Sequence, residues 1–163
     1  MRLAAITGLV TFLVDQALKY HVVHVLRLDQ RLAIDVIPPF LNLRMAWNQG
    51  INFGLFAGHG DAVRWALVAL ALAISAAVWV WARRERGRPL VQLSAGLLVG
   101  GAFGNVVDRV IYGAVADFLN MSCCGIDNPF AFNVADIAIF AGAIGLAVFS
   151  GGPKPRDAAR RMR

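Results

Sequence analysis

Two aspartates, Asp117 and Asp136, lie near the two ends of one short connection between hydrophobic segments. Because they flank the same connection, both must lie on the same side of a membrane, whichever way the chain is oriented. Two neighbouring carboxylates do not both ionise easily, so one keeps a proton while the other stays charged. Such a pair can hydrolyse a peptide bond without a metal, because the charged member activates water and the protonated member binds the scissile carbonyl.

A structural interpretation of the same residues is also open. Asp117 could cap a helix or turn, and Asp136 could form a structural ion pair with Arg109. Spacing alone does not decide between this interpretation and an acid–base pair.

The composition is that of a membrane protein. Of the 163 residues, 58% are hydrophobic, and the mean hydropathy is +0.61, which is too apolar for a soluble domain of this length. We therefore predict an all-α membrane protein, formed by one domain over residues 1–163. Four segments approach the length of about 20 residues that a membrane-spanning helix needs, and they are residues 3–26, 62–82, 91–112 and 132–149.

The net charge of +6 could suggest a nucleic-acid partner, but the basic residues follow the loops instead of one face. Arg2, the 83–88 loop and the 151–163 tail hold 10 of the 16 lysines and arginines. Four spans place all three segments on one side, which the positive-inside rule makes cytoplasmic. We therefore expect both termini in the cytoplasm, a tail on anionic lipid and no nucleic-acid partner.

The first span begins like a cleavable signal peptide. We expect it to remain uncleaved, because no small-residue cleavage site is evident and the helical pattern continues beyond the apolar start. Asp15 and Lys19 fall in its second half, at a spacing of four that puts them on one helical face.

Residues 27–60 have a different pattern, which predicts a small antiparallel sheet on the outer membrane surface. Pro38 and Pro39 break any helix, and residues 41–47 then alternate apolar and other side chains. A turn at 48–50 leads to a second apolar run at 51–56. Residues 113–131 are predicted to be an outer loop.

Polar residues also gather at the outer end of the third span. Asn105, Asp108 and Arg109 share one helical face, and Gly113 is predicted to end that helix. Asn133 and Asp136 share a face at the start of the fourth span. Four glycines in the third span are interpreted as positions of close helix packing, and they are Gly96, Gly100, Gly101 and Gly104.

Cysteine and histidine provide weaker candidates for chemistry. Cys123 and Cys124 are adjacent, so they form no ordinary disulfide framework, and no histidine lies in their loop to activate a nucleophile. His21, His24 and His59 could suggest a metallopeptidase, but the H-E-x-x-H motif is absent. We therefore expect no metal and no cofactor.

A proton or ion carrier is the main alternative outside the enzymes, because charged side chains on three spans could line a polar path. These polar residues cluster in the outer half, whereas the cytoplasmic halves carry no charged relay, and this disfavours the alternative. A liposome flux assay would distinguish an ion carrier from an enzyme. The residues that could line the polar path of an ion carrier are Asp15, Lys19, Asp108, Arg109 and Asp136.

Another intramembrane protease, of the presenilin type, is disfavoured because its Gly-x-Gly-Asp signature is absent.

Five short segments, in this order and topology, resemble the lipoprotein signal peptidases, the signal peptidase II family of membrane aspartic peptidases. The resemblance covers nearly the whole chain. The matching segments are Asp15-Gln16-Ala17-Leu18-Lys19, Asn48-Gln49-Gly50-Ile51-Asn52-Phe53-Gly54, Gly104-Asn105-Val106-Val107-Asp108-Arg109, Val115-Ala116-Asp117-Phe118 and Phe132-Asn133-Val134-Ala135-Asp136.

The resemblance implies that Asp117 and Asp136 are the catalytic pair. The substrate would be a membrane-anchored preprotein, cut before a cysteine that carries diacylglycerol. Arg109 and Asn133 would supply donors to the pair or to the substrate backbone, and Asp108 would organise the third span. The implied supporting residues are Asp15, Lys19, Asn48, Gly50, Asn105, Asp108, Arg109 and Asn133.

The same resemblance implies a bacterial inner-membrane enzyme with its site on the extracytoplasmic face and the outer sheet as a cradle over the substrate. We expect contact with membrane lipids and a monomer. The chain departs from the usual pattern at Asn52, where the family commonly has a small residue, and at the Cys123-Cys124 loop.

Overall fold

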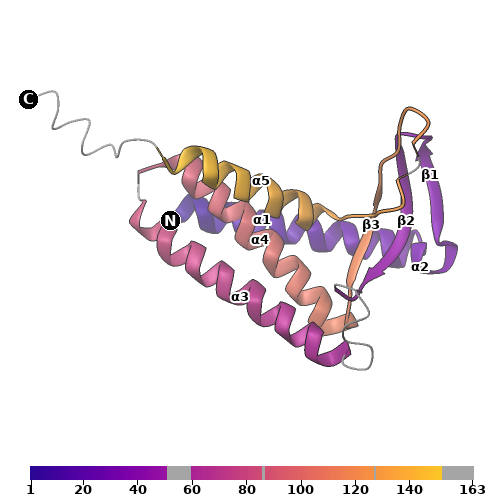
Figure 1. Cartoon of the computed structure of the whole chain (residues 1–163), viewed down its shortest axis with the longest axis horizontal. Coiled ribbons are helices and arrows are strands. Elements are labelled where there is room, and N and C mark those ends of the chain that lie inside the picture. The colour runs from indigo at the N-terminus through magenta and orange to yellow at the C-terminus, as the bar shows by residue number, and fades with distance from the viewer. Residues whose placement is uncertain (51–59, 86, 127, 152–163) are drawn as a thin grey trace, which may run out of the picture.

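The computed structural model describes residues 1–50, 60–85, 87–126 and 128–151. Helix α1 (Arg2–Tyr20) continues into a π-helical turn, η1 (His21–Val25), and a short helix α2 (Leu28–Arg31) follows. The other helices are α3 (Gly60–Arg84), α4 (Pro89–Tyr112) and α5 (Val134–Phe149), and Figure 1 shows α1, α3, α4 and α5 running side by side. The predicted apolar run at 51–56, including Asn52, and nearly all of the basic tail lie outside the described residues.

Three described helices, Arg2–Val25, Asp61–Arg84 and Pro89–Tyr112, are long and apolar enough to cross a membrane, at 24 residues each. Helix α5 is apolar but has only 16 residues. The chain is a multi-pass membrane protein, and the predicted helical fold with a small sheet is confirmed. The last helix begins two residues later than the predicted span, because Asn133 has an extended backbone and forms the N-cap.

Helix α4 lies at the centre and packs against α1, α3 and α5. Its N-terminus carries Pro89 in the first turn, and Gly113 ends it in a left-handed conformation, as predicted. The glycines of α4 allow close packing. A Cβ atom on Gly96 would lie 2.7 Å from the carbonyl oxygen of Ala4, and one on Gly101 would lie 2.5 Å from that of Ala135.

Gly100→Ala is expected to destabilise the protein, because the added methyl group would collide with the backbone of Gly8 on α1. Backbone atoms cannot move away as a flexible side chain can, so α1 and α4 must separate. We expect a loss of about 1–3 kcal/mol in unfolding free energy, measured as a lower midpoint of thermal unfolding in detergent. Gly151→Ala is the control, since a Cβ atom there meets nothing within 4 Å. Equal midpoints for the two variants would contradict the expectation.

A three-stranded antiparallel sheet, in the order β1-β2-β3, lies at one end of the helices (Figure 1). Its strands are β1 (Ala33–Ile37), β2 (Leu41–Asn48) and β3 (Val115–Asn120). Strand β2 matches the predicted alternating segment. Strand β3 comes from residues 113–131, for which we predicted only a loop, and it pairs with β2 through Ala46 opposite Asp117.

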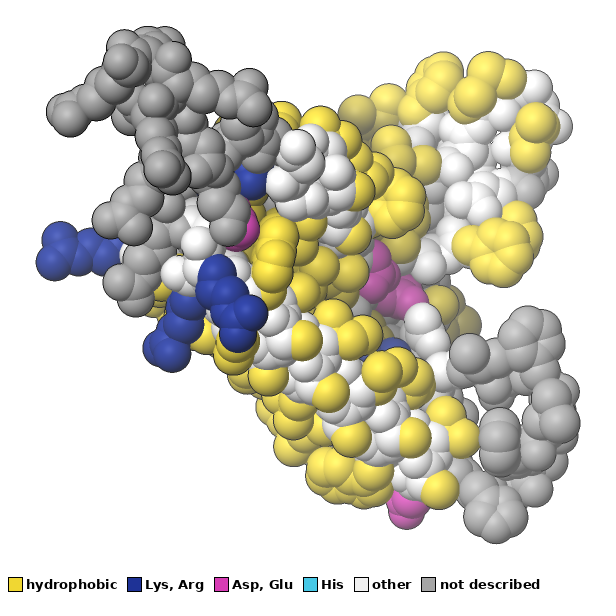
Figure 2. Space-filling model, turned by 60° about the vertical axis from the view of Figure 1, so that its left-hand side comes forward, with side chains coloured by type: hydrophobic (Ala, Val, Ile, Leu, Met, Phe, Trp, Pro, Cys, Tyr) yellow, Lys and Arg dark blue, Asp and Glu magenta, His cyan; other side chains and the backbone are white. Residues whose placement is uncertain are grey.

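The sheet is fixed to the helices by a small apolar core. This core contains Val22 of η1, Leu28 of α2, Leu43 of β2 and Phe118 of β3, all buried. The C-terminal end of α3 and the N-terminal end of α4 lie at the opposite end of the molecule (Figure 1). Figure 2 shows Lys and Arg side chains gathered at that other end.

Candidate active site

Strand β3 and helix α5 bring the two predicted aspartates to one place. Asp117 is the third residue of β3 and Asp136 lies in the first turn of α5. Between them is Asn133, the N-cap of α5. Its side-chain oxygen accepts a hydrogen bond from the backbone N–H of Asp136, and the Asp136 side chain accepts one from the backbone N–H of Asn133. This reciprocal capping box fixes the start of the helix.

Asn133 also binds Asp117. Its Nδ2 donates a hydrogen bond to Oδ1 of Asp117 at 2.6 Å, while its backbone N–H donates to Oδ2 of Asp136 at 3.2 Å. Asn133 is fully buried, at 0% exposure. The two carboxylates are therefore held by a single buried residue.

Asp117 is enclosed from its other side by β2. Nδ2 of Asn48 donates to Oδ2 of Asp117 at 3.0 Å, and Oδ1 of Asn48 accepts the backbone N–H of Gly50 at 3.0 Å. Gly50 has a φ of 110°, a conformation that favours glycine. Burial raises the pKa of Asp117 to about 6; the charge of Asp136 also raises it, while the bonds from Asn48 and Asn133 lower it.

This raised pKa predicts a pH-dependent stability. The ordinary pKa of Asp117 is 3.8, so between about pH 4 and 6 the folded state binds more protons than the unfolded state. The contribution of Asp117 to the free energy of unfolding therefore falls as pH rises through that window and is constant above it. The pKa difference corresponds to a loss of roughly 3 kcal/mol.

The measurement compares thermal unfolding of the wild type and of Asp117→Asn in detergent from pH 4 to 8. We expect the wild type to lose stability relative to the variant as pH rises to about 6 and to change no further above pH 7. Curves that stay parallel throughout would contradict the raised pKa.

Asp136 has its own pair of donors. Besides the backbone N–H of Asn133, Nδ2 of Asn105 donates to Oδ1 of Asp136 at 2.8 Å. Asp136 also lies in the first turn of α5, where the helix dipole favours a negative charge. The chemistry of its surroundings therefore suits an ionised carboxylate.

The predicted pairing of Asp15 with Lys19 is confirmed, and Asp108 joins it. Nζ of Lys19 lies 2.9 Å from Oδ2 of Asp15 and 2.7 Å from Oδ2 of Asp108. It also donates to Oδ1 of Asn105 at 3.1 Å. This ion cluster is buried between α1 and α4 and continues into the aspartate pair through Asn105.

Arg109 lies near the pair without forming the structural ion pair considered above. Its charge interacts with those of Asp117 and Asp136, but within the described parts of the chain no salt bridge joins Arg109 to Asp136. Its Nη1 donates to the backbone oxygen of Asn105 at 3.4 Å. Its Nε is buried and has no hydrogen-bond partner among the described residues.

Sequence reasoning missed three polar contributions to this network. Gln16 donates to Asp108 at 3.0 Å and to Asp15 at 3.2 Å. The backbone N–H groups of Ala116 and Ala135 donate to the same two carboxylates. Gln16 was visible as a polar residue beside Asp15 on the first span. The backbone donors carry no sequence signal, because nearly every residue has one.

Among the described residues, no hydrogen bond or ion pair joins the other chemical candidates to the aspartate pair. Ring nitrogen Nε2 of His24 is 3.3 Å from the hydroxyl of Tyr112, and His59 is outside the described residues. Cys123 and Cys124 form a disulfide between adjacent residues. Within the described ranges, no group of three or more His, Cys, Asp or Glu side chains could hold a metal ion.

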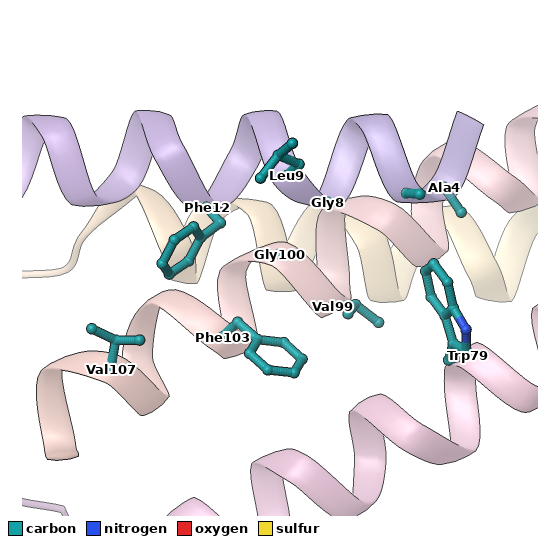
Figure 3. A pocket seen from close by; sticks show the side chains of 10 residues that line it. Ala4, Gly8, Leu9, Phe12, Trp79, Val99, Gly100, Phe103 and Val107 are labelled. Carbon is teal, nitrogen blue, oxygen red and sulfur yellow. The ribbon is translucent and has the colours of Figure 1, made fainter. Parts of the chain in front are cut away.

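The surface has a polar hollow and a separate apolar pocket. Figure 2 shows acidic side chains where the apolar helical body meets the lobe at the upper right. The pocket, of about 350 Å³, lies between α1, α3 and α4, and Figure 3 shows Phe12, Phe103 and Trp79 around it. No ionisable residue lines it. It can hold an apolar chain but not the proposed acid–base chemistry.

Comparisons with known proteins identify the family of the chain. The family model for signal peptidase (SPase) II matches residues 7–150. A "Lipoprotein signal peptidase" of Methylobacterium sp. (strain 4-46) is 44% identical over 142 residues, which cover 87% of this chain and 84% of that protein. One of Rhodopseudomonas palustris (strain ATCC BAA-98 / CGA009) is 36% identical, with 90% of each chain covered.

The fold also matches a solved structure described as a bacterial membrane enzyme at 1.9 Å resolution. The TM-score is 0.73 at 27% identity, and the match covers 89% of this chain and 90% of the other. Because the family model matches residues 7–150 and a relative 44% identical matches 87% of this chain, the chain belongs to the signal peptidase II family.

Proposed function

We propose that this signal peptidase II is an aspartic endopeptidase in which Asp117 and Asp136 form the catalytic pair. Its reaction is the removal of signal peptides from prolipoproteins, with cleavage before the lipid-modified cysteine. The observation that supports the pair most directly is that one buried residue, Asn133, binds both carboxylates. Two acidic groups held this way can share one proton and act on one water molecule.

In the proposed mechanism, the ionised carboxylate takes a proton from water as the water oxygen attacks the scissile carbonyl carbon. The protonated carboxyl group donates a hydrogen bond to the carbonyl oxygen, where negative charge develops. The proton removed from water then goes to the leaving amine as the C–N bond breaks. The pair ends with one proton, as it began.

We assign the shared proton to Asp117 and the base to Asp136. Asp117 is only 3% exposed, and burial raises its pKa to about 6. Asp136 lies in the first turn of α5 and accepts hydrogen bonds from Asn105 and from the backbone of Asn133. Burial favours the neutral form of Asp117, and the hydrogen-bond donors and the helix dipole favour the charged form of Asp136.

Substrate binding is proposed to use Arg109 and the sheet. The unpartnered Nε of Arg109 is suited to a backbone carbonyl of the signal peptide, because guanidinium groups donate but never accept hydrogen bonds. Asn48 and Gly50, at the end of β2, would form the part of the cradle nearest Asp117. The remaining proposed supporting residues are Asp15, Lys19, Asn105, Asp108 and Asn133.

The charge distribution supports the proposed orientation. The sheet lies at the end of the helices opposite the α3–α4 connection (Figure 1), whose neighbourhood carries Arg83, Arg84 and Arg88. With that basic end in the cytoplasm, the aspartates lie at the extracytoplasmic face of the bacterial inner membrane and both termini are cytoplasmic. We propose a monomer in contact with membrane lipids, with no nucleic-acid partner and no cofactor.

The test uses the purified full chain in detergent with a preprotein carrying a diacylglyceryl-modified cysteine. We expect cleavage directly before that cysteine, in the presence of a strong chelator as in its absence. The same preprotein without the lipid is the matched control and should remain intact. Equal cleavage of both substrates, or a loss of turnover that added metal restores, would contradict the proposal.

A further inference from the structure

We propose that the buried ion cluster of Lys19, Asp15 and Asp108 fixes the positions of both catalytic aspartates, so that its members act as positioning residues. This inference rests on the proposed function above. Among the hydrogen bonds of the described residues, none joins a member of this cluster directly to the carboxylate of Asp117 or Asp136. The charge of Lys19 acts on Asp117 directly, whereas the positioning proposed here passes through other groups.

Lys19 is the centre of the cluster, and all its donors are used. An ammonium group has three N–H bonds, and Nζ has three acceptors: Asp15 at 2.9 Å, Asp108 at 2.7 Å and Asn105 at 3.1 Å. Lys19 is 5% exposed and Asp15 is 0% exposed. A buried charge cluster with every donor satisfied has one arrangement, because any other would leave a charge unpaired in a dry site.

Each carboxylate of the cluster then binds the main chain directly before a catalytic residue. Oδ1 of Asp15 accepts the backbone N–H of Ala135 at 2.9 Å, and Ala135 precedes Asp136. Oδ2 of Asp108 accepts the backbone N–H of Ala116 at 3.2 Å, and Ala116 precedes Asp117. Lys19 is therefore linked by two short paths, through Asp15 to the start of α5 and through Asp108 to strand β3.

The third partner of Lys19 orients a donor to the pair. Because the ammonium group cannot accept a hydrogen bond, it requires the oxygen of Asn105 to face it. The amide nitrogen of Asn105 must then point the other way, toward Oδ1 of Asp136 at 2.8 Å. Nδ2 of Asn133 donates to the same oxygen of Asn105 at 3.2 Å, so Lys19 and Asn133 together hold this orientation of the amide.

The packing around Asp15 leaves little room for another arrangement. Gly104 of α4 lies so close that a Cβ atom there would collide with Oδ2 of Asp15. Gln16 adds donors to both Asp15 and Asp108. The positions of the Asp117 and Asp136 carboxylates are thus set by contacts among α1, α4, β3 and α5.

The first test removes one path at a time with Asp15→Ala and Asp108→Ala. A displacement of about 1 Å in a catalytic group can cost about 100-fold in rate, so we expect kcat to fall about 10- to 100-fold. KM should stay within about threefold, because neither residue is proposed to contact the substrate. Asp61→Asn, at an exposed position, is the control. Unchanged kcat, or equal effects on kcat and KM, would overturn the proposal.

The second test is a rescue that separates hydrogen-bond acceptors from charge. In Asp15→Asn, one oxygen must serve both Lys19 and the N–H of Ala135, so one donor is lost and kcat should fall about tenfold or more. The variant Asp15→Asn/Lys19→Met/Asp108→Asn removes the competing ammonium group, and each new amide oxygen can then face its backbone N–H. We expect its kcat to exceed that of Asp15→Asn several-fold.

A folded triple variant with kcat no higher than that of Asp15→Asn would overturn the proposal, even if the alanine variants fail to fold. Wild type and Asp117→Asn are measured in the same assay to keep the two inferences apart. Cleavage by the wild type alone supports the proposed function whatever the cluster variants do. Cleavage by Asp117→Asn would refute the proposed function and this inference with it.

Discussion

Asp117→Asn and Asp136→Asn are each expected to lower kcat for prolipoprotein cleavage by about 10³-fold or more. Each change removes either the group that takes a proton from water or the one that donates to the scissile carbonyl, and such groups contribute about 10²–10⁴-fold. The two act on the same water molecule, so the double variant should be no slower than the slower single variant. The measurement is the rate of signal-peptide release from the lipid-modified preprotein in detergent.

Asn is nearly the same size as Asp, so the variants should fold. Asp61→Asn makes the same chemical change at an exposed carboxylate, 89% exposed, and should leave kcat unaltered. A thermal unfolding midpoint within a few degrees of wild type establishes that a slow variant is intact. Substantial turnover by either intact variant would mean that the carboxylate in question takes no part in the chemistry.

Asn133→Ala is expected to have the second largest effect, because this residue serves both carboxylates at once. The change removes the 2.6 Å hydrogen bond to Asp117 and the N-cap of α5. Loss of the cap should cost about 1–2 kcal/mol of stability. Misplacement of the pair should lower kcat about 100-fold.

Asn133→Ser separates these two contributions. Serine is an equally good N-cap, so the stability should stay near that of the wild type. Its hydroxyl is too short to reach Asp117 from the position of the amide, so kcat should still fall well below wild type. If the serine variant instead turns over as fast as the wild type, the hydrogen bond to Asp117 contributes nothing to catalysis. Both variants are compared by thermal unfolding and by initial rates.

The sequence was enough to predict the helices, because their signal is local. Apolar composition over about 20 residues and the periodicity of Asp15 with Lys19 both depend on neighbours in the chain. The pairing of these two residues is confirmed at 2.9 Å. Strand β2 was predicted for the same reason, since alternation along one segment is a local pattern.

Strand β3 was missed because five of its six residues are buried and the sixth is partly buried, so it lacks the alternation of a half-exposed strand. Asp117 in its centre also disfavours a strand by propensity. What decides the structure there is pairing with β2, about 70 residues earlier in the chain. A contact that distant is not encoded in any short window of sequence.

The roles of the polar residues were only partly accessible. The shared face of Asn105 and Asp108 was predicted, but not that Lys19 would bind both. That arrangement depends on how α1 packs against α4. The glycines of α4 permit close packing, but they do not specify the position of one helix along the other.

The shortness of α5 has a consequence for how water reaches the substrate. Its 16 residues rise about 24 Å, whereas the hydrocarbon layer is about 30 Å thick. Local thinning of the surrounding lipid is one way in which a bilayer accommodates a helix shorter than its hydrocarbon layer. Thinning here would bring the headgroup region closer to the end of α5 that begins at Val134. A lipid-anchored preprotein would then meet water for hydrolysis without leaving the bilayer.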